Sequence, residues 1–523
     1  MFSETFPLTI SQLVWAVIAF EIFRWVFRWL WRRVKYDLHK MPGPRGLPVI
    51  GHAHLIEGGN QPRFTTQVHR WALEYGKVYR LKMMSKDLII VSDPKFVQEH
   101  VHGPGQKDLP KIDSYSKNFN KVFTPYDVSG IFTMAKTDEK YKSFRKTLAS
   151  AFSTEALRRG YPALLAKSKQ LTSKIGSITA DGSSIDMQDL ALKCAFDCIG
   201  HFAYGLDFDA TKKGTHPLLE AIISTTADSR VGALKPFWKL YKKLAPFSAV
   251  VQHSKRMHEL LYSEYEKIMD AIDLSGPPPA EDDRSIRAQL MRLRNPLNDN
   301  KRATREETYC EMATFLIGGV DTTSHQLCWV LVCLSTHLDV QDRVYSELKE
   351  HGLAGVDGKD PEYSILTNLT YLNHALKEGL RLIPVGPGGS GRSTQTDLDV
   401  LGYRVPKGTT IMAQRRTLNT CPWVWENADK YNPDRWASKS RGVDGGTTEG
   451  ERKIWTFGSG ARSCVGQRLA MMQLQMMLVV LLSKFRFTLD PRMGGFQGAM
   501  DRGYDTLVFS CEGGLWLKAS PRE

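Results

Sequence analysis

A lone cysteine in a glycine-rich loop is the residue of this sequence with the clearest chemistry. Cys464 stands in the stretch 455–466, two residues after Arg462 and just before an apolar, helix-forming segment that runs to about residue 485. Backbone N–H groups and the positive dipole end at a helix start favour a thiolate over a thiol, and the Arg462 cation adds to this effect. A thiolate is a good ligand for soft iron. The stretch therefore predicts a metal-ligand loop, and the bland alternative is an inert cysteine on a buried turn.

A second group of chemically useful residues lies midway along a predicted helix from about 304 to 337, which begins with a capping box. Gly318 and Gly319 are adjacent in its interior, where each glycine costs roughly 1 kcal/mol, and room for a flat cofactor would offset that cost. Asp321 and Thr322 follow closely. An acid beside an alcohol can supply protons to a pocket that otherwise excludes water. The alternative is an ordinary polar stripe, since Ser and Thr often hydrogen-bond back within helices.

Another pair shares one face of a predicted helix nearer the N-terminus. Tyr141 and Arg145, in the segment 139–151, are four residues apart and therefore neighbours on the helix surface. The pair could place an aromatic hydroxyl and a cation side by side. The alternative is a solvated basic face, which is common on helices.

The spacing F-x-x-G-x-R-x-C-x-G, from Phe457 to Gly466, is the signature of the cytochrome P450 family, which this sequence resembles from about Pro42 to its end. By this resemblance Cys464 is the axial thiolate of haem b, and it pushes electron density onto the iron to favour O–O cleavage. The resemblance also implies that Phe457 packs beside the ligand and that Arg462 meets a haem propionate.

Other stretches resemble family motifs as well. Residues 318–323 match the family pattern G-G-x-D-T-T at every position, which gives Asp321 and Thr322 the acid and alcohol roles. The helix with Tyr141 and Arg145 corresponds to the family motif W-x-x-x-R, with tyrosine in place of tryptophan. The haem contacts that the resemblance implies, besides Cys464, are Tyr141, Arg145, Gly318, Arg392, Phe457 and Arg462.

An E-x-x-R motif in the predicted helix 371–381 places Glu378 and Arg381 on one helix face. Such pairs are frequent in helices, so the motif alone is weak. Together with the segment 432–436, which resembles a family motif and contains Arg435, it predicts a three-residue ion network. We expect this network to support the chain that leads to the cysteine loop and to take no part in catalysis.

The pattern of elements favours a mainly α fold with a small β portion, and the resemblance implies the cytochrome P450 fold in a single large domain. Short apolar runs at 78–81 and 88–91 predict a β-hairpin. A proline-rich hinge at 41–48 separates an N-terminal membrane anchor with its basic flank, 1–40, from the haem-thiolate catalytic domain, 49–523.

The N-terminal segment predicts attachment to a membrane. Its apolar run from 8 to 31 contains several tryptophans, and its uncharged part, 6–20, is short for a full span. Positive residues follow the run, so the flanking-charge rule leaves the rest of the chain in the cytosol. Either a single pass or an amphipathic helix lying in the interface fits this pattern. We expect the protein on the endoplasmic reticulum membrane with a cytosolic catalytic domain.

The composition of the chain limits the classes of binding partner that are expected. The net charge is +14, but charges of both signs are interspersed, and no basic stripe with interleaved aromatic residues indicates nucleic-acid binding. The eight cysteines lack the spacings of zinc sites and suggest a reducing compartment. No dinucleotide-binding G-x-G-x-x-G loop follows a predicted strand, so a separate electron donor is expected.

The resemblance implies a haem-thiolate monooxygenase that oxidises a lipophilic sterol, terpenoid, fatty acid or xenobiotic. NADPH-cytochrome P450 reductase, possibly with cytochrome b5, would deliver the electrons. An acidic reductase face would meet basic residues near the thiolate: Lys140, Lys142, Lys146, Arg452, Lys453 and Arg468. Three alternatives remain: a haem-thiolate isomerase or peroxide-rearranging enzyme, a non-catalytic haem sensor, and a membrane-tethered binding protein without haem.

Overall fold

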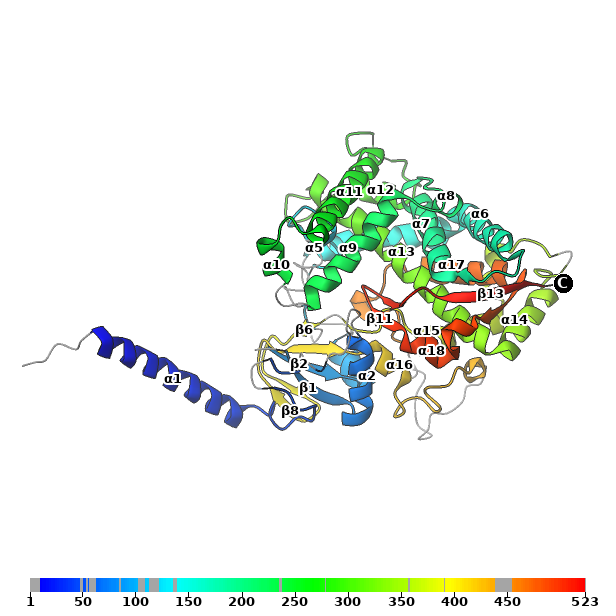
Figure 1. Cartoon of the computed structure of the whole chain (residues 1–523). Helices are drawn as coiled ribbons and strands as arrows, with labels where there is room; N and C mark the ends of the chain where they lie inside the picture. Colours follow the sequence, from blue (N-terminus) through cyan, green and yellow to red (C-terminus); the bar gives the residue numbers. More distant parts are fainter. Residues whose placement is uncertain are drawn as a thin grey trace, which may run out of the picture.

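Helices dominate the computed structural model of this chain (Figure 1). The structure describes residues 10–47, 50–52, 55, 63–83, 86–101, 109–111, 122–134, 139–234, 238–277, 279–355, 358–389, 391–437 and 454–522. The α-helices are α1 (Ile10–Lys35), α2 (Phe64–Tyr75), α3 (Pro94–His100), α5 (Glu139–Ala149), α6 (Thr154–Thr179), α7 (Met187–Tyr204), α8 (Ala210–Lys213), α9 (Pro217–Leu234), α10 (Trp238–Leu244), α11 (Ala249–Ile272), α12 (Ile286–Met291), α13 (Arg305–Thr336), α14 (Leu338–Glu350), α15 (Thr370–Leu382), α16 (Arg415–Thr420), α17 (Gln467–Leu482) and α18 (Gly495–Asp501).

Short strands form the small β portion. They are β1 (Val78–Met83), β2 (Lys86–Val91), β3 (Ile185–Asp186), β4 (Arg294–Asn295), β5 (Lys301–Arg302), β6 (Arg392–Ser393), β7 (Leu398–Val400), β8 (Tyr403–Val405), β9 (Thr410–Ala413), β10 (Phe485–Leu489), β11 (Gly503–Asp505), β12 (Phe509–Cys511) and β13 (Trp516–Pro521). The largest sheet has the order β1-β2-β9-β6. The predicted hairpin is confirmed, because β1 and β2 pair antiparallel, with Val78 opposite Val91.

The long helix α13 runs through the middle of the helical part, and most of its residues are buried. Its start agrees with the predicted capping box: the Thr304 hydroxyl accepts from the N–H of Glu307, whose side chain bonds back to the Thr304 N–H. Helix α7 packs along it, and the Tyr204 hydroxyl donates to the Met312 carbonyl at 2.7 Å. The prediction of a mainly helical single domain is confirmed.

A buried ion network supports the chain between α15 and the cysteine loop. Arg381 and Glu378 are both fully buried, with Arg381 Nη2 2.7 Å from Glu378 Oε1 and Arg435 Nε 2.8 Å from the same oxygen. Arg381 also donates to three backbone carbonyls, of Asn419, Ala428 and Lys430. The predicted network is confirmed, and the structure adds Trp436, whose indole N–H donates to Glu378 Oε2 at 3.0 Å.

Helix α1 departs from the body of the protein (Figure 1). Large apolar side chains along it are exposed, from Trp15 at 70% to Val34 at 86%. Among the described helices none is long and apolar enough to cross a bilayer, so the structure gives no support to the spanning version of the predicted anchor.

The segment that follows α1 is held against the sheets. The Asp37 N–H donates to the Arg404 carbonyl at 3.0 Å, and the Arg404 N–H donates back to the Asp37 carboxylate at 3.0 Å. Farther along, the Arg80 N–H of β1 donates to the Pro42 carbonyl at 2.9 Å. Close packing also explains the glycine at 43, where a Cβ would lie 2.4 Å from the Arg80 carbonyl oxygen. The described part of the predicted hinge, 41–47, is therefore docked on strand β1.

Candidate functional site

Cys464 lies between the short 3-10 turn Gly460–Arg462 and the start of α17. Its backbone N–H donates to the Phe457 carbonyl at 2.9 Å, which closes the loop on itself. All eight cysteines are described, and Cys464 alone is exposed. Cys464 helps to line a partly open pocket of about 830 Å³, so the thiol is accessible to a ligand bound there. The other lining residues are Arg145, Ala149, Phe152, Thr154, Leu157, Tyr363, Leu366, Thr367, Val465, Gln467, Arg468, Met471, Met472 and Gln475.

Opposing effects act on the Cys464 thiol. Burial has the largest effect and raises its pKa, whereas the Gly466 N–H and the Arg145 and Arg415 cations lower it. The net direction is upward. The sequence-based argument that Arg462 assists the thiolate needs correction, because Arg462 points elsewhere and the cations that act on the sulfur come from α5 and α16.

The two glycines of α13 have different roles. A Cβ on Gly318 would meet nothing within 4 Å, so this face of the helix is open. A Cβ on Gly319 would lie 2.7 Å from the Ile199 side chain of α7. The prediction that both glycines make room for a cofactor is therefore corrected: Gly318 provides the open face, and Gly319 permits α13 and α7 to pack closely.

Asp321 and Thr322 are adjacent but do not bond to each other among the described contacts. The Thr322 hydroxyl donates back to the Gly318 carbonyl at 2.6 Å. One oxygen of the Asp321 carboxylate lies 3.2 Å from Nδ1 of His325, one turn further along the helix. The sequence argument missed His325, although its spacing of four residues from Asp321 was a visible signal.

The cysteine loop is braced by the residues predicted to meet haem propionates. The Tyr141 hydroxyl donates to the Ala461 carbonyl at 2.6 Å, and Arg145 Nη2 donates to the Ser463 carbonyl at 2.8 Å. The Arg462 guanidinium lies 3.8 Å from the centre of the Tyr141 ring. These contacts fix the loop on α5, and propionate binding by Tyr141, Arg145 and Arg462 remains a prediction.

One short segment joins the cysteine loop to α13. The Ile131 carbonyl accepts from Arg462 Nη1 at 2.9 Å, and Arg462 Nη2 also donates to the Met134 carbonyl. The Ile131 N–H donates to Glu311 of α13 at 2.8 Å. Ile131 therefore links the cysteine loop, which it contacts through its carbonyl, to α13, which it contacts through its N–H.

A cluster of cations lies beside these residues. Arg392 begins β6, and its guanidinium donates to the Leu109 carbonyl at 3.3 Å. Lys111, which pairs with Arg392 across an isolated β-bridge, donates to the Phe132 carbonyl. Burial, followed by the fields of Arg462, Arg392 and Arg415, lowers the pKa of Lys111 well below its usual range. Sequence reasoning missed Lys111 and Arg415, because both lie outside any recognisable motif.

Phe152 connects the cavity to α13. Its ring lines the cavity beside Cys464, and its centre is 5.7 Å from that of Phe315. Phe457 is half-buried and packs against the main core beside the loop. The thiol, the aromatic wall and the open face of α13 are thus parts of one packed region.

These residues fit haem b. A soft thiol reaches a partly open pocket, Gly318 leaves a helix face open to a flat ring, and Arg392, Arg415 and Arg462 concentrate positive charge suited to two propionates. Cys464 would ligate the iron.

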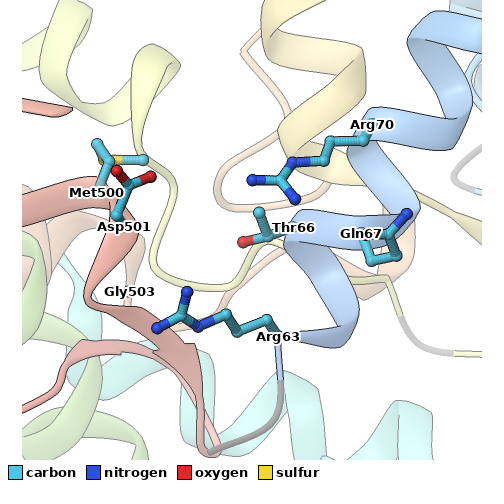
Figure 2. Close-up of a pocket in the computed structure, with 7 residues that line it drawn as sticks. All are labelled: Arg63, Thr66, Gln67, Arg70, Met500, Asp501 and Gly503. Carbon is cyan, nitrogen blue, oxygen red and sulfur yellow. The ribbon is translucent and has the colours of Figure 1, made fainter. Parts of the chain in front are cut away.

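A second, smaller cavity of about 80 Å³ lies between α2 and the segment of α18 and β11 (Figure 2). Arg70 points into it from α2 and Arg63 from the N-cap of that helix, and Asp501 lies across from them. None of the predicted site residues lines it.

Comparison with known proteins identifies the family of this chain. The family model described as Cytochrome P450 matches residues 41–495. The chain is 25% identical over 515 residues to "Putative cytochrome P450 CYP13A1" of Caenorhabditis elegans, covering 91% of this chain and 92% of that protein. It is 28% identical over 411 residues to "Cytochrome P450 monooxygenase mpsF" of Macrophomina phaseolina, covering 77% of this chain and 93% of that protein.

A solved structure has the same fold. The "Crystal structure of cytochrome P450DA heme domain" superimposes with a TM-score of 0.75 at 21% identity, covering 92% of this chain and 97% of that one. The family match spans both the cysteine loop and α13. The chain belongs to the cytochrome P450 family, the monooxygenases that hold haem b through a cysteine thiolate.

Proposed function

We propose that this monooxygenase inserts one oxygen atom of dioxygen into a lipophilic small molecule of the sterol, terpenoid, fatty-acid or xenobiotic class. The observation that carries the proposal is the coexistence of Cys464 at a partly open pocket with Gly318, Asp321 and Thr322 on α13. When bound, haem supplies the reducible iron at which dioxygen is activated. The chain's own residues would ligate the iron, leave room for substrate, exclude water and deliver protons.

A separate flavoprotein reductase would supply the NADPH electrons. Lys142 and Lys146 are exposed one turn apart on α5, and Arg468 is exposed on the rim of the cavity that reaches Cys464. Together they form a basic surface suited to an acidic partner. Lys140 does not belong to it, because its ammonium lies 2.6 Å from the Glu307 carboxylate. Two other predicted members, Arg452 and Lys453, lie outside the described residues.

Attachment to a membrane, which we also propose, would suit an enzyme with a lipophilic substrate. Large apolar side chains are exposed where α10 meets α11, and we name Leu240, Tyr241, Leu244, Phe247 and Val250 the α10–α11 patch. Its most exposed members are Phe247 at 89% and Leu244 at 75%. Exposed apolar groups of this size favour a lipid surface. We propose that α1 lies in the interface of the endoplasmic reticulum membrane, with the catalytic domain on its cytosolic side.

The test combines spectroscopy with turnover. The reduced, carbon-monoxide-bound protein should give a thiolate-type absorption spectrum, and Cys464→Ser should abolish that spectrum while some haem remains bound. Cys421→Ser, which changes a buried cysteine elsewhere in the fold, should leave the spectrum unchanged. A thiolate-type spectrum in Cys464→Ser would require another ligand.

Turnover measurements then distinguish a monooxygenase from an isomerase and from a sensor. With reductase, a lipophilic substrate should gain one oxygen atom as NADPH is consumed. Rearrangement of a hydroperoxide without NADPH would indicate an isomerase, and a normal spectrum with no turnover of any kind would indicate a sensor.

A further inference from the structure

His325 is buried beside Asp321 and has no role in the motifs that define the family. Its Nδ1 is 2.8 Å from the Asp321 carbonyl oxygen and 3.2 Å from the Asp321 carboxylate. The His325 side chain is 7% exposed and that of Asp321 is 15% exposed. Both neighbours of Nδ1 are acceptors, so this nitrogen carries the proton and shares it between them.

The surroundings favour the charged ring. Burial lowers the pKa of His325, but the charge and the hydrogen bonds of Asp321 outweigh it, and the net direction is upward from 6.5. The Asp186 carboxylate, at the N-cap of α7, acts in the same direction. The Ser324 hydroxyl, 3.4 Å from Nδ1, is neutral and donates to the Val320 carbonyl at 2.8 Å.

His325 holds one oxygen of the Asp321 carboxylate and leaves the other oxygen available. Oδ1 is held at His325, whereas Oδ2 is buried without a hydrogen-bond partner among the described residues. Burying a carboxylate oxygen without a hydrogen-bond partner costs free energy, and this cost points to a functional role for Oδ2 of Asp321. Thr322 is the next residue, and its hydroxyl oxygen can still accept a proton while its own proton is donated to the Gly318 carbonyl.

We propose that His325 is the positioning residue and proton source for Asp321, an inference that rests on the proposed monooxygenation. In each transfer the N–H bond at Nδ1 breaks and an O–H bond forms on Oδ1, which leaves a neutral ring beside a neutral acid. Rotation of the carboxyl group turns this O–H toward Thr322; the O–H bond then breaks, which restores the Asp321 carboxylate, and the proton is consumed where dioxygen is reduced to water. The ring regains its proton from solvent water.

The first experiment tests the ion pair without relying on catalysis. Thermal unfolding of the purified protein is followed between about pH 5 and 9 for wild type and His325→Asn, which retains an N–H near the position of Nδ1 but removes the charge. A histidine whose folded pKa is raised stabilises the protein fully below the unfolded value of 6.5 and loses this effect as pH rises through the folded value. The variant should therefore unfold at a lower temperature at acidic pH, and the difference should shrink as pH rises.

His337→Asn is the matched control. His337, at the C-cap of the same helix, bonds through Nδ1 to the Cys333 carbonyl at 2.9 Å, the same spacing of four residues but without the aspartate. Its effect on the unfolding temperature should not vary with pH in this way. A pH-independent effect of His325→Asn, or one that grows with pH, would overturn the ion pair.

The second experiment measures product formed per NADPH over the same pH range. His325→Asn should lower this ratio by roughly tenfold near neutral pH and flatten its pH dependence, because loss of a proton donor costs rate. Substrate affinity, measured by the spectral change on binding, should stay within about twofold, since a wild-type-like pocket is retained. An unchanged ratio and pH profile would remove His325 from the reaction. If wild type itself lacks oxygenation, the proposed function fails, and the unfolding experiment still decides whether the pair exists.

Discussion

At the scale of single residues, Thr322 illustrates how one side chain can serve the helix and the reaction. Its hydroxyl closes a 2.6 Å hydrogen bond to the Gly318 carbonyl, which orients it on the open face of α13. Thr322→Ala should therefore leave the fold intact but remove a proton donor, so product per NADPH should fall roughly tenfold while peroxide is released. Measuring product, peroxide and NADPH together checks this. Thr322→Ser, which keeps the hydroxyl, should preserve most of the ratio.

The buried carboxyl group of Glu311 should make the unfolding free energy of the protein depend on pH. Burial raises its pKa to about 8, against the opposing effect of the Ile131 N–H. Because its folded pKa is above the unfolded value of 4.5, its stabilising contribution is complete below pH 4.5 and is lost as pH rises toward 8. Glu311→Gln keeps the acceptor for Ile131 and cannot ionise. Its unfolding free energy relative to wild type should increase across this range by on the order of a few kcal/mol. A constant difference between pH 4 and pH 9 would contradict the burial argument.

At the scale of elements, we expect substitutions of the two glycines of α13 to have opposite effects on the unfolding free energy. Gly318→Ala meets nothing within 4 Å and should raise the unfolding free energy by about 1 kcal/mol through helix propensity. Gly319→Ala brings its methyl group to 2.7 Å from Ile199 and should lower it by about 1–3 kcal/mol. The double change Gly319→Ala with Ile199→Ala should recover part of the loss relative to the sum of the single changes. Denaturant unfolding of all four variants checks the cycle, and equal effects of the two glycine changes would refute it.

What the sequence could predict at this scale depended on local spacing. The bounds of α13, Arg305–Thr336, follow from its capping box and period, and Cys464 follows from a motif contained in ten residues. The different roles of Gly318 and Gly319 could not be predicted, because the distinction comes from Ile199 on another helix. Lys111 approaches Arg392 through a β-bridge between chain segments that have no shared pattern. Long-range packing of this kind leaves no trace in a local window.

At the scale of the whole molecule, attachment to membranes should depend on α1. Deleting residues 1–40 removes its exposed apolar surface but retains the contact between Pro42 and Arg80 and every residue of the haem site. The truncated protein should leave the membrane fraction and still bind haem. High salt should release part of the full-length protein, because an interfacial helix is held partly by charge.

The α10–α11 patch provides the control for this deletion. Leu244→Asp and Phe247→Asp change its two most exposed residues without touching α1. In the truncated protein, they should remove any residual membrane binding. Full retention of the truncated protein on membranes, even with both changes, would show that attachment does not depend on either surface.

The docked segment after α1 would limit how the protein turns on a membrane if α1 attaches it there. Asp37 bonds to Arg404 of β8 through its backbone N–H and its carboxylate, and Pro42 bonds to β1, so only a few residues separate the end of α1 from the body. A free linker would permit rotation about every bond, whereas this segment transmits the direction of α1 to the sheets. Helix α10 lies at the edge of the body from which α1 departs (Figure 1). If α1 lies on a membrane as proposed, a few hydrogen bonds more than thirty residues into the chain would set the tilt of the protein and the side of it that faces the lipid.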